Sequence, residues 1–386
     1  MGVPTWHDPN ELRSALRDFL STHATHERLA DFDEREAFDV DFYRSLVRAG
    51  FLQLDADPGV HGPSSRAQAI VLEELGATAT SIGVACVVQF MGVHLLETRA
   101  TPEQKTRWLQ PLYAGDMHMS FALSEPDGGT DVARAMKTTA ERHPEGGWVL
   151  NGAKKWIGAA NHSNYLIVLA RTAPIERSSI DGISMFIVPT STAGVSASVI
   201  DTMGIRGLEQ NDVQFDDVRV GDEALMGEEG RGFRYVLATL NGERLNAAAV
   251  ALGIGRGALD AAVAWAKQRE AFGRPVGAFQ ALQHSLVDAA MEVEAARLML
   301  EKALIASDVA GEPDEVPSAM AKLAASRAGT TASDVGMRVM AGWGFARFSP
   351  MQRYFRDARL YTFAPLTDEM TKNYLGEKLL GLPRSF

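Results

Sequence analysis

The spacing of apolar residues along the chain changes twice, and each change marks an expected domain boundary. Up to about residue 120, apolar positions recur at helical intervals, as at Leu12 and Leu16, which is typical of one face of an α-helix. Thr101 followed by Pro102 is the pattern of a helix N-cap with proline at the first helical position. We therefore predict a helical domain over residues 1–120.

After Gly115 the apolar residues gather in short runs separated by turn residues. These runs, rich in β-branched and aromatic side chains, cover residues 148–150, 165–169, 183–188 and 213–215. Asn151-Gly152 follows the first run and indicates a hairpin turn. The stretch predicts a small β domain over residues 121–228, with a hairpin at Asn151-Gly152.

From residue 229 the helical period returns and continues to the C-terminus. One apolar stripe of a long helix is formed by Leu282, Leu286, Val293, Leu300 and Leu304. Gly311-Glu312-Pro313 is expected to end that helix, and another helical stretch starts near Lys322. The fold class predicted from these patterns is mainly α with a central β domain, and residues 229–386 form the C-terminal helical domain.

Composition narrows the classes of partner. A length of 386 residues predicts two or three domains. The hydrophobic fraction of 46% is ordinary for a globular protein with a large core. The net charge of −11 repels phosphate backbones and anionic surfaces, so neither nucleic acid nor a membrane is an expected principal partner. The single cysteine, Cys86, lies in an apolar run and is expected to pack in the core; it allows no intrachain disulfide or thiolate metal cluster.

No window of the chain is expected to approach the roughly 18 uncharged apolar residues that a membrane span needs. The N-terminal residues show no apolar segment of a secretory signal and no Arg- and Ser-rich transit pattern. Together with the lone cysteine, these features lead us to expect a cytoplasmic protein.

Several catalytic signatures are absent from the sequence. The nine histidines are scattered without a His-Glu-x-x-His pattern, so no metal site is expected. There is also no Gly-x-Ser-x-Gly nucleophile elbow. Gly253-Ile254-Gly255-Arg256-Gly257 resembles a dinucleotide loop, but it lies in an Ala-rich helical stretch with no preceding strand. Close packing between helices explains these glycines better.

Two segments of the β region offer groups to a ligand. Ser124-Glu125-Pro126-Asp127-Gly128-Gly129-Thr130-Asp131 predicts a tight turn whose backbone amides can face a ligand; an ordinary surface loop has the same composition. Lys155-Trp156-Ile157-Gly158, expected at the start of a strand, carries a flat aromatic ring that can stack on a cofactor. A single tryptophan is, however, more often part of a core.

Glu243 lies beside Arg244 in an otherwise apolar, Ala-rich helical stretch, Leu240-Asn241-Gly242-Glu243-Arg244-Leu245. A solvated ion pair is one interpretation of this pair. In an apolar pocket, Glu243 would instead have a raised pKa and could serve as a general base.

Six motifs, in one order and spread over almost the whole chain, resemble those of the acyl-CoA dehydrogenase family. They are Phe121-Ala122-Leu123-Ser124-Glu125-Pro126-Asp127-Gly128-Gly129-Thr130-Asp131, Asn151-Gly152-Ala153-Lys154-Lys155-Trp156-Ile157, Gly204-Ile205-Arg206-Gly207, Arg269-Glu270-Ala271-Phe272-Gly273-Arg274-Pro275 with Phe279-Gln280, Gly342-Trp343-Gly344, and Arg356-Asp357-Ala358-Arg359. The family fold is an N-terminal helical domain, a β domain and a C-terminal four-helix bundle, in tetramers. The resemblance therefore implies a homotetramer that binds FAD.

The resemblance also implies roles for individual residues. The first motif would hold the flavin, and Trp156 would pack against the isoalloxazine ring. Asn241, Arg244, Leu366 and Thr130 are implied to contact the substrate. The implied FAD-binding residues are Phe121, Leu123, Ser124, Gly129, Thr130, Trp156, Ile157 and Gly158, then Thr367 and Glu369, and, reaching the FAD of a neighbouring subunit, Arg269, Phe272, Gln280, Arg338 and Gly342.

The implied reaction is α,β-desaturation of an acyl thioester, in which a carboxylate takes the α-proton and the β-hydride passes to flavin N5. Many family members carry that carboxylate in a C-terminal Tyr-Glu-Gly-Thr motif, but here the matching position is Pro365. The long-chain and isovaleryl-type members place it in a Glu-Arg-Leu motif, which Glu243-Arg244-Leu245 matches. We therefore expect Glu243 to be the base, with an electron-transferring flavoprotein as electron acceptor.

Three residues depart from the family pattern. Pro365 has no backbone N–H to donate to the thioester carbonyl, so Leu366 or the flavin ribityl hydroxyl would have to supply the hydrogen bond. Gly158 stands where a threonine usually contacts the flavin, and Arg338 replaces a glutamine.

Several functions stay open at this point. The acyl group could be carried by CoA or by an acyl-carrier protein. The same fold could serve as an enoyl-thioester reductase, a short acyl-CoA oxidase or a weakly active structural homologue. Gln89, Phe90 and Met91 are candidates for the floor of the acyl pocket, although Phe90 is better explained as core.

Overall fold

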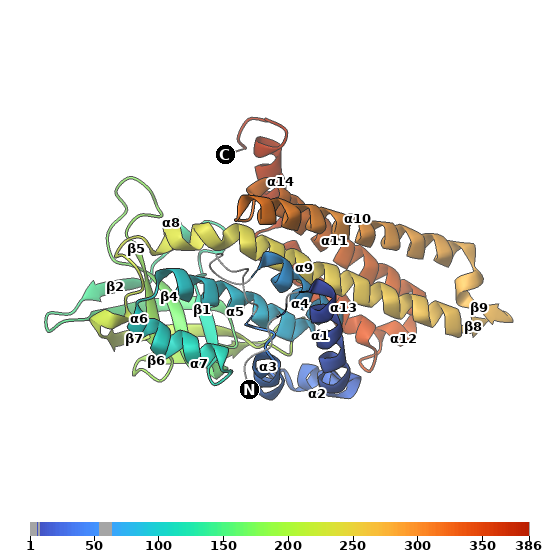
Figure 1. Ribbon diagram of the computed structural model, residues 1–386, viewed down its shortest axis with the longest axis horizontal. Coiled ribbons are helices and arrows are strands. Elements are labelled where there is room, and N and C mark those ends of the chain that lie inside the picture. The colour runs from blue at the N-terminus through green and yellow to red at the C-terminus, as the bar shows by residue number, and fades with distance from the viewer. Residues whose placement is uncertain (1–5, 7, 54–63, 386) are drawn as a thin grey trace.

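The computed structural model describes residues 6, 8–53 and 64–385. Helices occupy both ends of the chain and a sheet lies between them in sequence, so the predicted fold class, mainly α with a central β domain, is confirmed. The sheet lies at one end of the elongated molecule, and the long C-terminal helices extend from it to the other end (Figure 1).

The N-terminal part is helical up to Tyr113. Thr101 caps the short helix α6: its hydroxyl accepts a hydrogen bond from the N–H of Gln104 at 3.2 Å, while the Gln104 side chain accepts from the N–H of Thr101 at 2.9 Å. This confirms the predicted N-cap. The elements are α1 (Pro9–His23), α2 (His26–Arg35), α3 (Val40–Arg48), α4 (Ser65–Thr78), α5 (Thr80–Arg99), α6 (Pro102–Gln104), a π-helical turn (Lys105–Leu109) and α7 (Gln110–Tyr113).

The expectation that no segment has the length and apolarity of a membrane span was wrong. Helices α5 and α9 (Gly232–Gln268) both meet that test, each with a window of mean hydropathy 1.4. In this fold 72% and 67% of those windows are buried inside the protein, so both are core helices. Cys86 lies in α5 and is buried, as predicted, and burial raises the pKa of its thiol to about 12.

Seven strands form the central sheet, in the order β1-β4-β2-β3-β7-β6, with β5 paired to β4. Strands β1 and β4 run parallel, whereas β3 pairs antiparallel with both β2 and β7. Both faces of β4 and β5 are buried, which explains their continuous apolar runs. The strands are β1 (Met119–Ala122), β2 (Thr139–Arg142), β3 (Trp148–Gly158), β4 (Tyr165–Arg171), β5 (Ile183–Pro189), β6 (Val195–Ile200) and β7 (Gln210–Val220).

The hairpin predicted at Asn151-Gly152 was also wrong. Strand β3 continues through these residues, and its register against β7 shifts between Leu150 and Gly152, which is a β-bulge. Gly152 has φ 144° there, and a Cβ on it would lie 2.6 Å from the Cα of Thr138. Glycine is therefore required at position 152 because the backbone of Thr138, just before β2, lies so close. The chain reverses earlier, at Gly146-Gly147 between β2 and β3.

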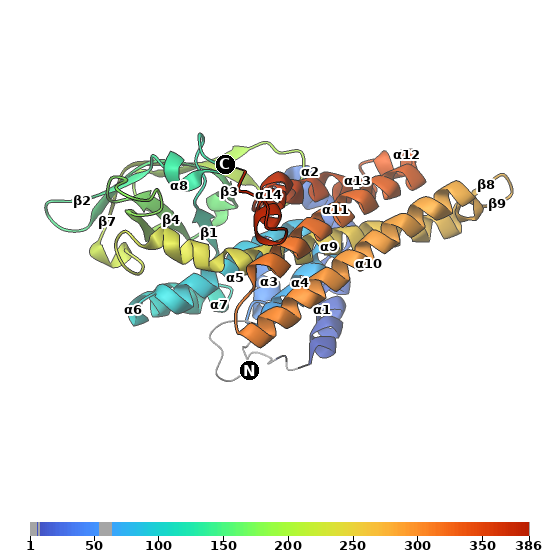
Figure 2. The same ribbon diagram turned by 90° about the horizontal axis from the view of Figure 1, so that it is seen from above.

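The C-terminal part contains three long helices that lie side by side (Figures 1 and 2). Gly311 ends α10 with φ 76°, as predicted, but α11 begins at Glu315 and not near Lys322. The long helices are α9, α10 (Gln280–Ala310) and α11 (Glu315–Met340); the shorter elements are β8 (Glu270–Ala271), β9 (Arg274–Pro275), α12 (Gly342–Phe345), α13 (Pro350–Asp357) and α14 (Asp368–Lys378).

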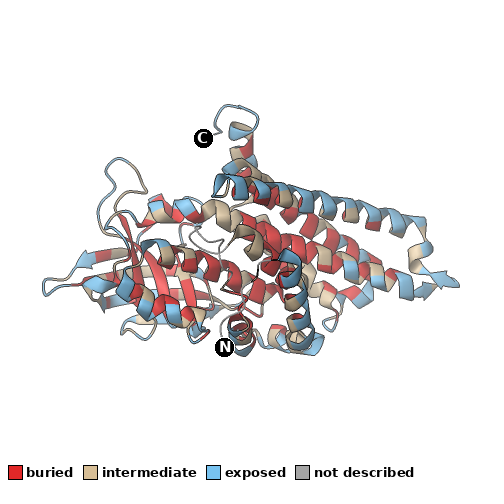
Figure 3. Cartoon of the chain, viewed as in Figure 1, coloured by how far each residue is buried: buried red, intermediate tan, exposed pale blue. Residues whose placement is uncertain are grey.

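Small residues let α9 pack closely against its neighbours. A Cβ on Gly253 would lie 2.2 Å from the carbonyl oxygen of Glu73 in α4, and one on Gly257 would lie 2.6 Å from that of Ala77. The prediction that these glycines serve helix packing is thus confirmed. Buried residues concentrate along the middle of α9 and in the sheet (Figure 3), so the core joins the N-terminal helices to the C-terminal ones.

Candidate functional site

The turn after β1 is fastened to the end of β3. The N–H of Lys155 donates to the carbonyl oxygen of Ser124 at 2.9 Å, and the ammonium of Lys154 donates to the carbonyl oxygen of Leu123 at 3.0 Å. These bonds bring the predicted flavin-binding turn beside Trp156, although 30 residues separate them in sequence. The two segments that sequence analysis selected for ligand binding are therefore one site.

A buried ion pair supports this turn from within the β domain. Lys154 donates to Glu125 at 2.9 Å, and Glu125 also accepts from the N–H groups of Lys137 at 2.6 Å and Thr138 at 3.0 Å. Burial by itself would raise the pKa of Glu125, but Lys154 and these donors hold it below its usual value. The turn is thereby held rigidly on one side and is free to meet a ligand on the other.

Trp156 does not belong to the core. It lies near the end of β3, not at the start of a strand as predicted, because β3 already begins at Trp148. Its side chain is 54% exposed and its backbone has φ 63°, in the left-handed region that bulky residues avoid. By contrast, Ile157 is buried and Phe121, Leu123, Ser124 and Gly158 are partly buried. An exposed indole held in an unfavourable backbone conformation is suited to stacking on a ligand.

Gly129 and Thr130 complete the open side of the turn. Both are exposed, and no described residue lies within 4 Å of where a Cβ on Gly129 would be. The backbone is therefore accessible to a ligand at the point where sequence analysis placed flavin contacts.

Glu243 lies in the third to fourth turn of α9 and does not open the helix, which begins at Gly232. No described residue forms a hydrogen bond or an ion pair with its carboxylate, and its side chain is partly buried. Burial raises the pKa of Glu243 to about 7, and the charge of Arg244 opposes this rise only in part. Glu243 is thus a carboxyl group whose pKa is raised to about 7 and that has no structural partner in the described part of the chain.

Asn241 and Arg244, close to Glu243 on the helix, interact with each other, and Arg244 also contacts α14. Arg244 donates to the side-chain oxygen of Asn241 at 2.7 Å, and its guanidinium lies over the ring of Tyr374 at 5.3 Å from the centroid. Asn241 donates to the carbonyl oxygen of Pro313 at 3.3 Å. Arg244 thus has its contacts with Asn241 and Tyr374, and the solvated ion pair with Glu243 considered from the sequence is not formed.

The segment after Pro365 is held by buried polar groups. The ammonium of Lys322 donates to the carbonyl oxygen of Leu366 at 2.7 Å and to Asp368 at 2.9 Å, and Ser326 donates to Asp368 at 3.2 Å. Thr367 caps α14 by accepting from the N–H of Met370 at 3.1 Å, while Glu369 is exposed.

The remaining residues predicted to contact FAD lie at the end of the long helices α9, α10 and α11 that is farthest from the sheet, here called the tip. Arg269, Gln280 and Arg338 are exposed there, and Phe272 is 94% exposed. Glu243 and Arg269 are 26 residues apart, so they lie about 39 Å apart along the helix axis. Gly342, also exposed, follows α11 at the same end. Within one chain these residues do not meet the turn around Ser124, which lies at the sheet end (Figure 1).

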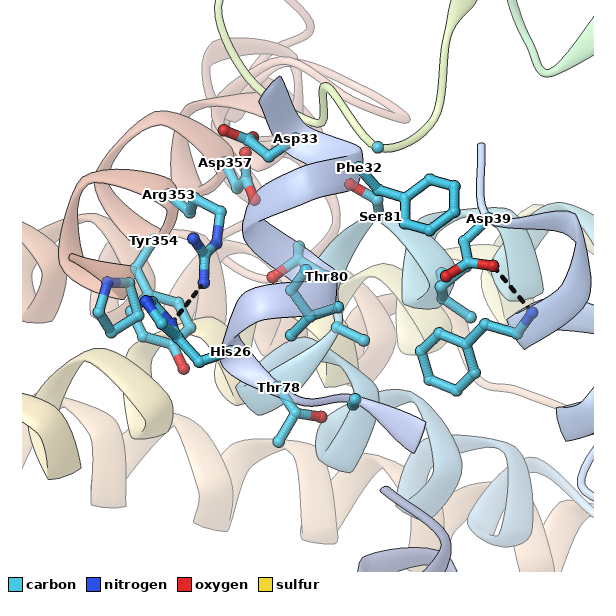
Figure 4. Close-up of a pocket in the computed structure, with 17 residues that line it drawn as sticks. His26, Phe32, Asp33, Asp39, Thr78, Thr80, Ser81, Arg353, Tyr354 and Asp357 are labelled. Carbon is cyan, nitrogen blue, oxygen red and sulfur yellow. Dashed lines mark hydrogen bonds between the residues drawn. The ribbon is translucent and has the colours of Figure 1, made fainter. Parts of the chain in front are cut away.

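A cavity that sequence analysis did not single out lies between α2, the start of α5 and α13 (Figure 4). It measures about 200 Å³. Arg353 and His26 lie side by side on its wall, with 3.3 Å between the guanidinium and Nδ1 of the imidazole, and the lining residue Asp33 pairs with Arg356. It contains none of the residues predicted to bind FAD or substrate.

Sequence reasoning also missed the polar groups that support the site. Lys154, Glu125 and Lys322 are nearly fully buried, although their charges gave no local signal of burial. Their burial becomes visible only in the folded structure, where Lys154 pairs with Glu125 and Lys322 pairs with Asp368, each far away in the sequence.

Comparison with known proteins agrees with this arrangement. Residues 7–116 match the family model "Acyl-CoA dehydrogenase, N-terminal domain", residues 120–218 the middle domain, and residues 230–380 the C-terminal domain. The short-chain specific acyl-CoA dehydrogenase, mitochondrial, of Rattus norvegicus is 35% identical over 380 residues, which cover 97% of this chain and 90% of that protein.

Two similar solved structures carry the same fold. The butyryl-CoA dehydrogenase from Megasphaera elsdenii superposes with a TM-score of 0.89 at 28% identity, covering 98% of this chain and 100% of that one. A glutaryl-CoA dehydrogenase from Mycobacterium smegmatis, in complex with FADH2, gives a TM-score of 0.90 at 25% identity, covering 99% of this chain and 96% of that one.

The chain belongs to the acyl-CoA dehydrogenase family. It is accordingly an FAD-dependent oxidoreductase that acts on CH–CH bonds of acyl-CoA. The residues present fit the flavin: the exposed Trp156 and the open backbone at Gly129 lie together, and a rigid turn supports them.

Proposed function

We propose that this protein dehydrogenates an acyl-CoA between Cα and Cβ with Glu243 as the base. The observation that carries the proposal is the unpaired carboxylate of Glu243, whose pKa burial raises to about 7. A general base is most effective when its pKa lies near the working pH. An ordinary surface glutamate would have a lower pKa and would be a weaker base.

Residues of two regions would hold the cofactor and the substrate. The turn from Leu123 to Thr130 and the indole of Trp156 are placed to bind FAD, which when bound supplies the acceptor for the β-hydride. Asn241 and Arg244 would bind the thioester; both lie within one turn of Glu243 on α9, which supports this assignment.

The carbonyl of the thioester needs hydrogen-bond donors, because negative charge develops on it as the α-proton leaves. Pro365 has no N–H, so we assign this role to the backbone N–H of Leu366. Lys322 donates to the carbonyl oxygen of Leu366 at 2.7 Å, which helps to hold this part of the backbone in place. Thr367 and Glu369 would contact FAD just beyond this point.

We infer that the complete FAD site needs a second copy of the chain. Arg269, Phe272, Gln280, Arg338 and Gly342 lie at the opposite end of the molecule from the turn around Ser124. The tip also exposes Trp343, Phe345 and Phe348, which are 51%, 80% and 61% exposed. Such an apolar surface is typical of an interface. A homotetramer with FAD sites shared between subunits accounts for both facts.

An electron-transferring flavoprotein is the electron acceptor that we propose, and the cytoplasm is the proposed location. Both rest on the character of the family and the composition of the chain. Oxygen consumption in the absence of an added acceptor would instead assign the protein as an oxidase.

Glu243→Gln tests the proposed base. The variant should keep bound FAD and affinity for the acyl-CoA but lose flavin bleaching, because the amide cannot take the α-proton. A loss of about 10³-fold or more in bleaching rate is expected. Asp260→Asn, an exposed carboxylate on the same helix, is the control and should bleach at the wild-type rate. Wild-type bleaching in Glu243→Gln would refute the assignment.

The substrate class can be read with the same signal. A panel of straight and branched acyl-CoAs, together with the same acyl groups on an acyl-carrier protein, should separate CoA from carrier-protein substrates. We expect acyl-CoA to bleach the flavin in the wild type. Bleaching only by carrier-bound acyl groups would contradict that expectation.

A further inference from the structure

A chain of buried polar side chains leads from helix α5 to the end of β3, where Trp156 and Gly158 lie. Gln89 donates to the imidazole of His118, with 3.1 Å between the nitrogens. His118 Nδ1 lies 3.0 Å from the hydroxyl of Ser163, which lies 2.6 Å from the hydroxyl of Ser120. All four side chains belong to buried residues. None of them was selected from the sequence as part of the FAD site.

The direction of these hydrogen bonds follows from the Gln89 amide. Its Nε2 donates to the carbonyl oxygen of Met119 at 2.8 Å, and its Oε1 accepts from the N–H of Met119 at 3.5 Å, which fixes how the amide is turned. Nε2 of Gln89 therefore faces His118, and Nε2 of the imidazole must accept. The ring hydrogen is then on Nδ1 and is donated to Ser163.

The chain ends on two backbone carbonyls of the flavin-facing segment. Ser120 donates to the carbonyl oxygen of Gly158 at 2.5 Å. The single hydroxyl hydrogen of Ser163 lies between two acceptors, the hydroxyl of Ser120 at 2.6 Å and the carbonyl oxygen of Ala159 at 3.0 Å, and is shared between them. In this order His118 donates to Ser163, Ser163 to Ser120, and Ser120 to Gly158, so the hydrogen bonds lead from Gln89 to this segment. Because Gly158 has no side chain of its own, hydrogen bonds to its backbone are what can hold it in place.

The segment needs such support because its backbone is strained. Trp156 has φ 63° and Ala159 has φ 51°, both in the left-handed region that residues with a Cβ avoid. Strained conformations persist only where the surroundings impose them, and they concentrate at binding sites. One of the hydrogen bonds above is accepted by Gly158, which lies between the two strained residues, and the other by Ala159, which is one of them.

His118 is kept neutral by its surroundings. Its ring packs against Phe38 at 5.1 Å and edge-on against Tyr43 at 4.9 Å between centroids. Burial, followed by the charge of nearby His162, lowers the pKa of His118 to about 3. The imidazole therefore remains a neutral donor and acceptor over the whole working pH range, which suits a fixed scaffold and not a proton carrier.

We propose that His118 is a positioning residue of the flavin site, which through Ser163 and Ser120 holds the backbone of Gly158 and Ala159 and so sets the orientation of Trp156 toward the flavin. The inference rests on the proposed function in that the ligand at Trp156 is FAD. It adds a residue that makes no contact with FAD and that lies 38 positions before Trp156 in the sequence.

Two substitutions of His118 separate a positioning role from a purely structural one. His118→Leu removes the donor to Ser163, whereas the side-chain nitrogen of His118→Asn can take the place of Nδ1 and keep it. The readouts are the dissociation constant of FAD, the visible circular dichroism of the bound flavin, and the temperature of unfolding. We expect His118→Leu to weaken FAD binding about tenfold and to change the flavin dichroism, and His118→Asn to restore both.

Ser120→Ala serves if His118→Leu does not fold, since it removes one hydroxyl next to Gly158. It should shift the FAD affinity and the flavin dichroism in the same direction, by about threefold in affinity. Ser307→Ala is the matched control, because Ser307 is a buried serine that donates to a backbone carbonyl in α10, at 2.9 Å. It should leave both flavin readouts unchanged.

The inference is overturned if His118→Leu or Ser120→Ala binds FAD with wild-type affinity and dichroism, whatever its unfolding temperature. It is also overturned if a folded His118→Asn shows the same flavin defects as His118→Leu. The proposed function fails by a different result, namely that wild-type protein binds FAD but no acyl thioester bleaches it. In that case the FAD-binding readouts still decide the role of His118.

Discussion

The ammonium of Lys322 on α11 donates a 2.7 Å hydrogen bond to the carbonyl oxygen of Leu366, 44 residues further along the chain. The same ammonium pairs with Asp368, the first residue of α14. Lys322 is only 2% exposed. This contact joins the helical bundle to the segment that replaces the family's usual catalytic glutamate.

Lys322→Met should reduce both stability and catalysis. Removing one partner of a buried pair leaves Asp368 uncompensated and is expected to cost about 3–5 kcal/mol of unfolding free energy. The Leu366 segment should also lose its orientation, which lowers the rate of flavin bleaching at saturating acyl-CoA. Urea unfolding and rapid-mixing absorbance measure the two effects. Lys302→Met, an exposed lysine of α10, is the control, and equal stability of the two variants would contradict the role of Lys322.

The rate of flavin bleaching should rise with pH through about 7. Glu243 must be ionised to accept the α-proton, and its pKa is raised to about 7. Single-turnover bleaching measured from pH 5 to pH 9 should therefore follow one ionisation near that value in the free protein. Asp260→Asn should show the same profile. A rate that is constant across pH 6–8 would mean that Glu243 titrates elsewhere or is not the base.

Glu243→Gln should stabilise the protein at alkaline pH. A carboxyl group whose pKa is raised on folding, here from 4.5 to about 7, binds its proton more tightly in the folded state. Its contribution to stability is therefore complete below pH 4.5 and is lost as the pH rises through 7. At pH 8 the variant should be more stable than wild type by roughly 1–3 kcal/mol, with little difference at pH 4.5. Thermal unfolding at both pH values is the measurement; a difference independent of pH would argue against the raised pKa.

Arg269→Ala should weaken FAD retention and oligomerisation together. Arg269 is exposed at the tip of the bundle, far from the turn around Ser124 in its own chain. If it binds the pyrophosphate of a neighbour's FAD, its loss should release flavin on gel filtration and shift the protein to smaller species. Arg297→Ala, an exposed arginine of α10 paired with Glu294, should change neither. A variant of unchanged size with full flavin content would refute the shared site.

Predictions from the sequence succeeded where neighbouring residues decide the structure. The apolar stripe of Leu286, Leu300 and Leu304, the N-cap at Thr101 and the helix end at Gly311 depend on interactions within a few residues. The family motifs, too, could be read in order, so the fold class and the use of FAD followed from the sequence. The motif and the apolar helix around Glu243 also predict that it is the base, and that assignment stays a prediction.

The sequence-based predictions failed where contacts with a distant segment of the chain determine the local structure. Asn151-Gly152 has the composition of a hairpin turn, yet the close approach of Thr138 makes Gly152 a bulge within a long strand. The apolar length of α5 fits a membrane span, yet packing inside the protein makes it a core helix.

The sequence by itself therefore determined the class of fold, the order of domains and the chemistry expected of Glu243, because periodicity, capping and motifs are local properties of the chain. Only the tertiary structure decided that Trp156 is exposed, that Arg244 contacts Asn241 and Tyr374 and does not pair with Glu243, and that Lys322 and His118 support the site. These outcomes depend on contacts between segments far apart in sequence and on the removal of charged and polar groups from water, which no local pattern records.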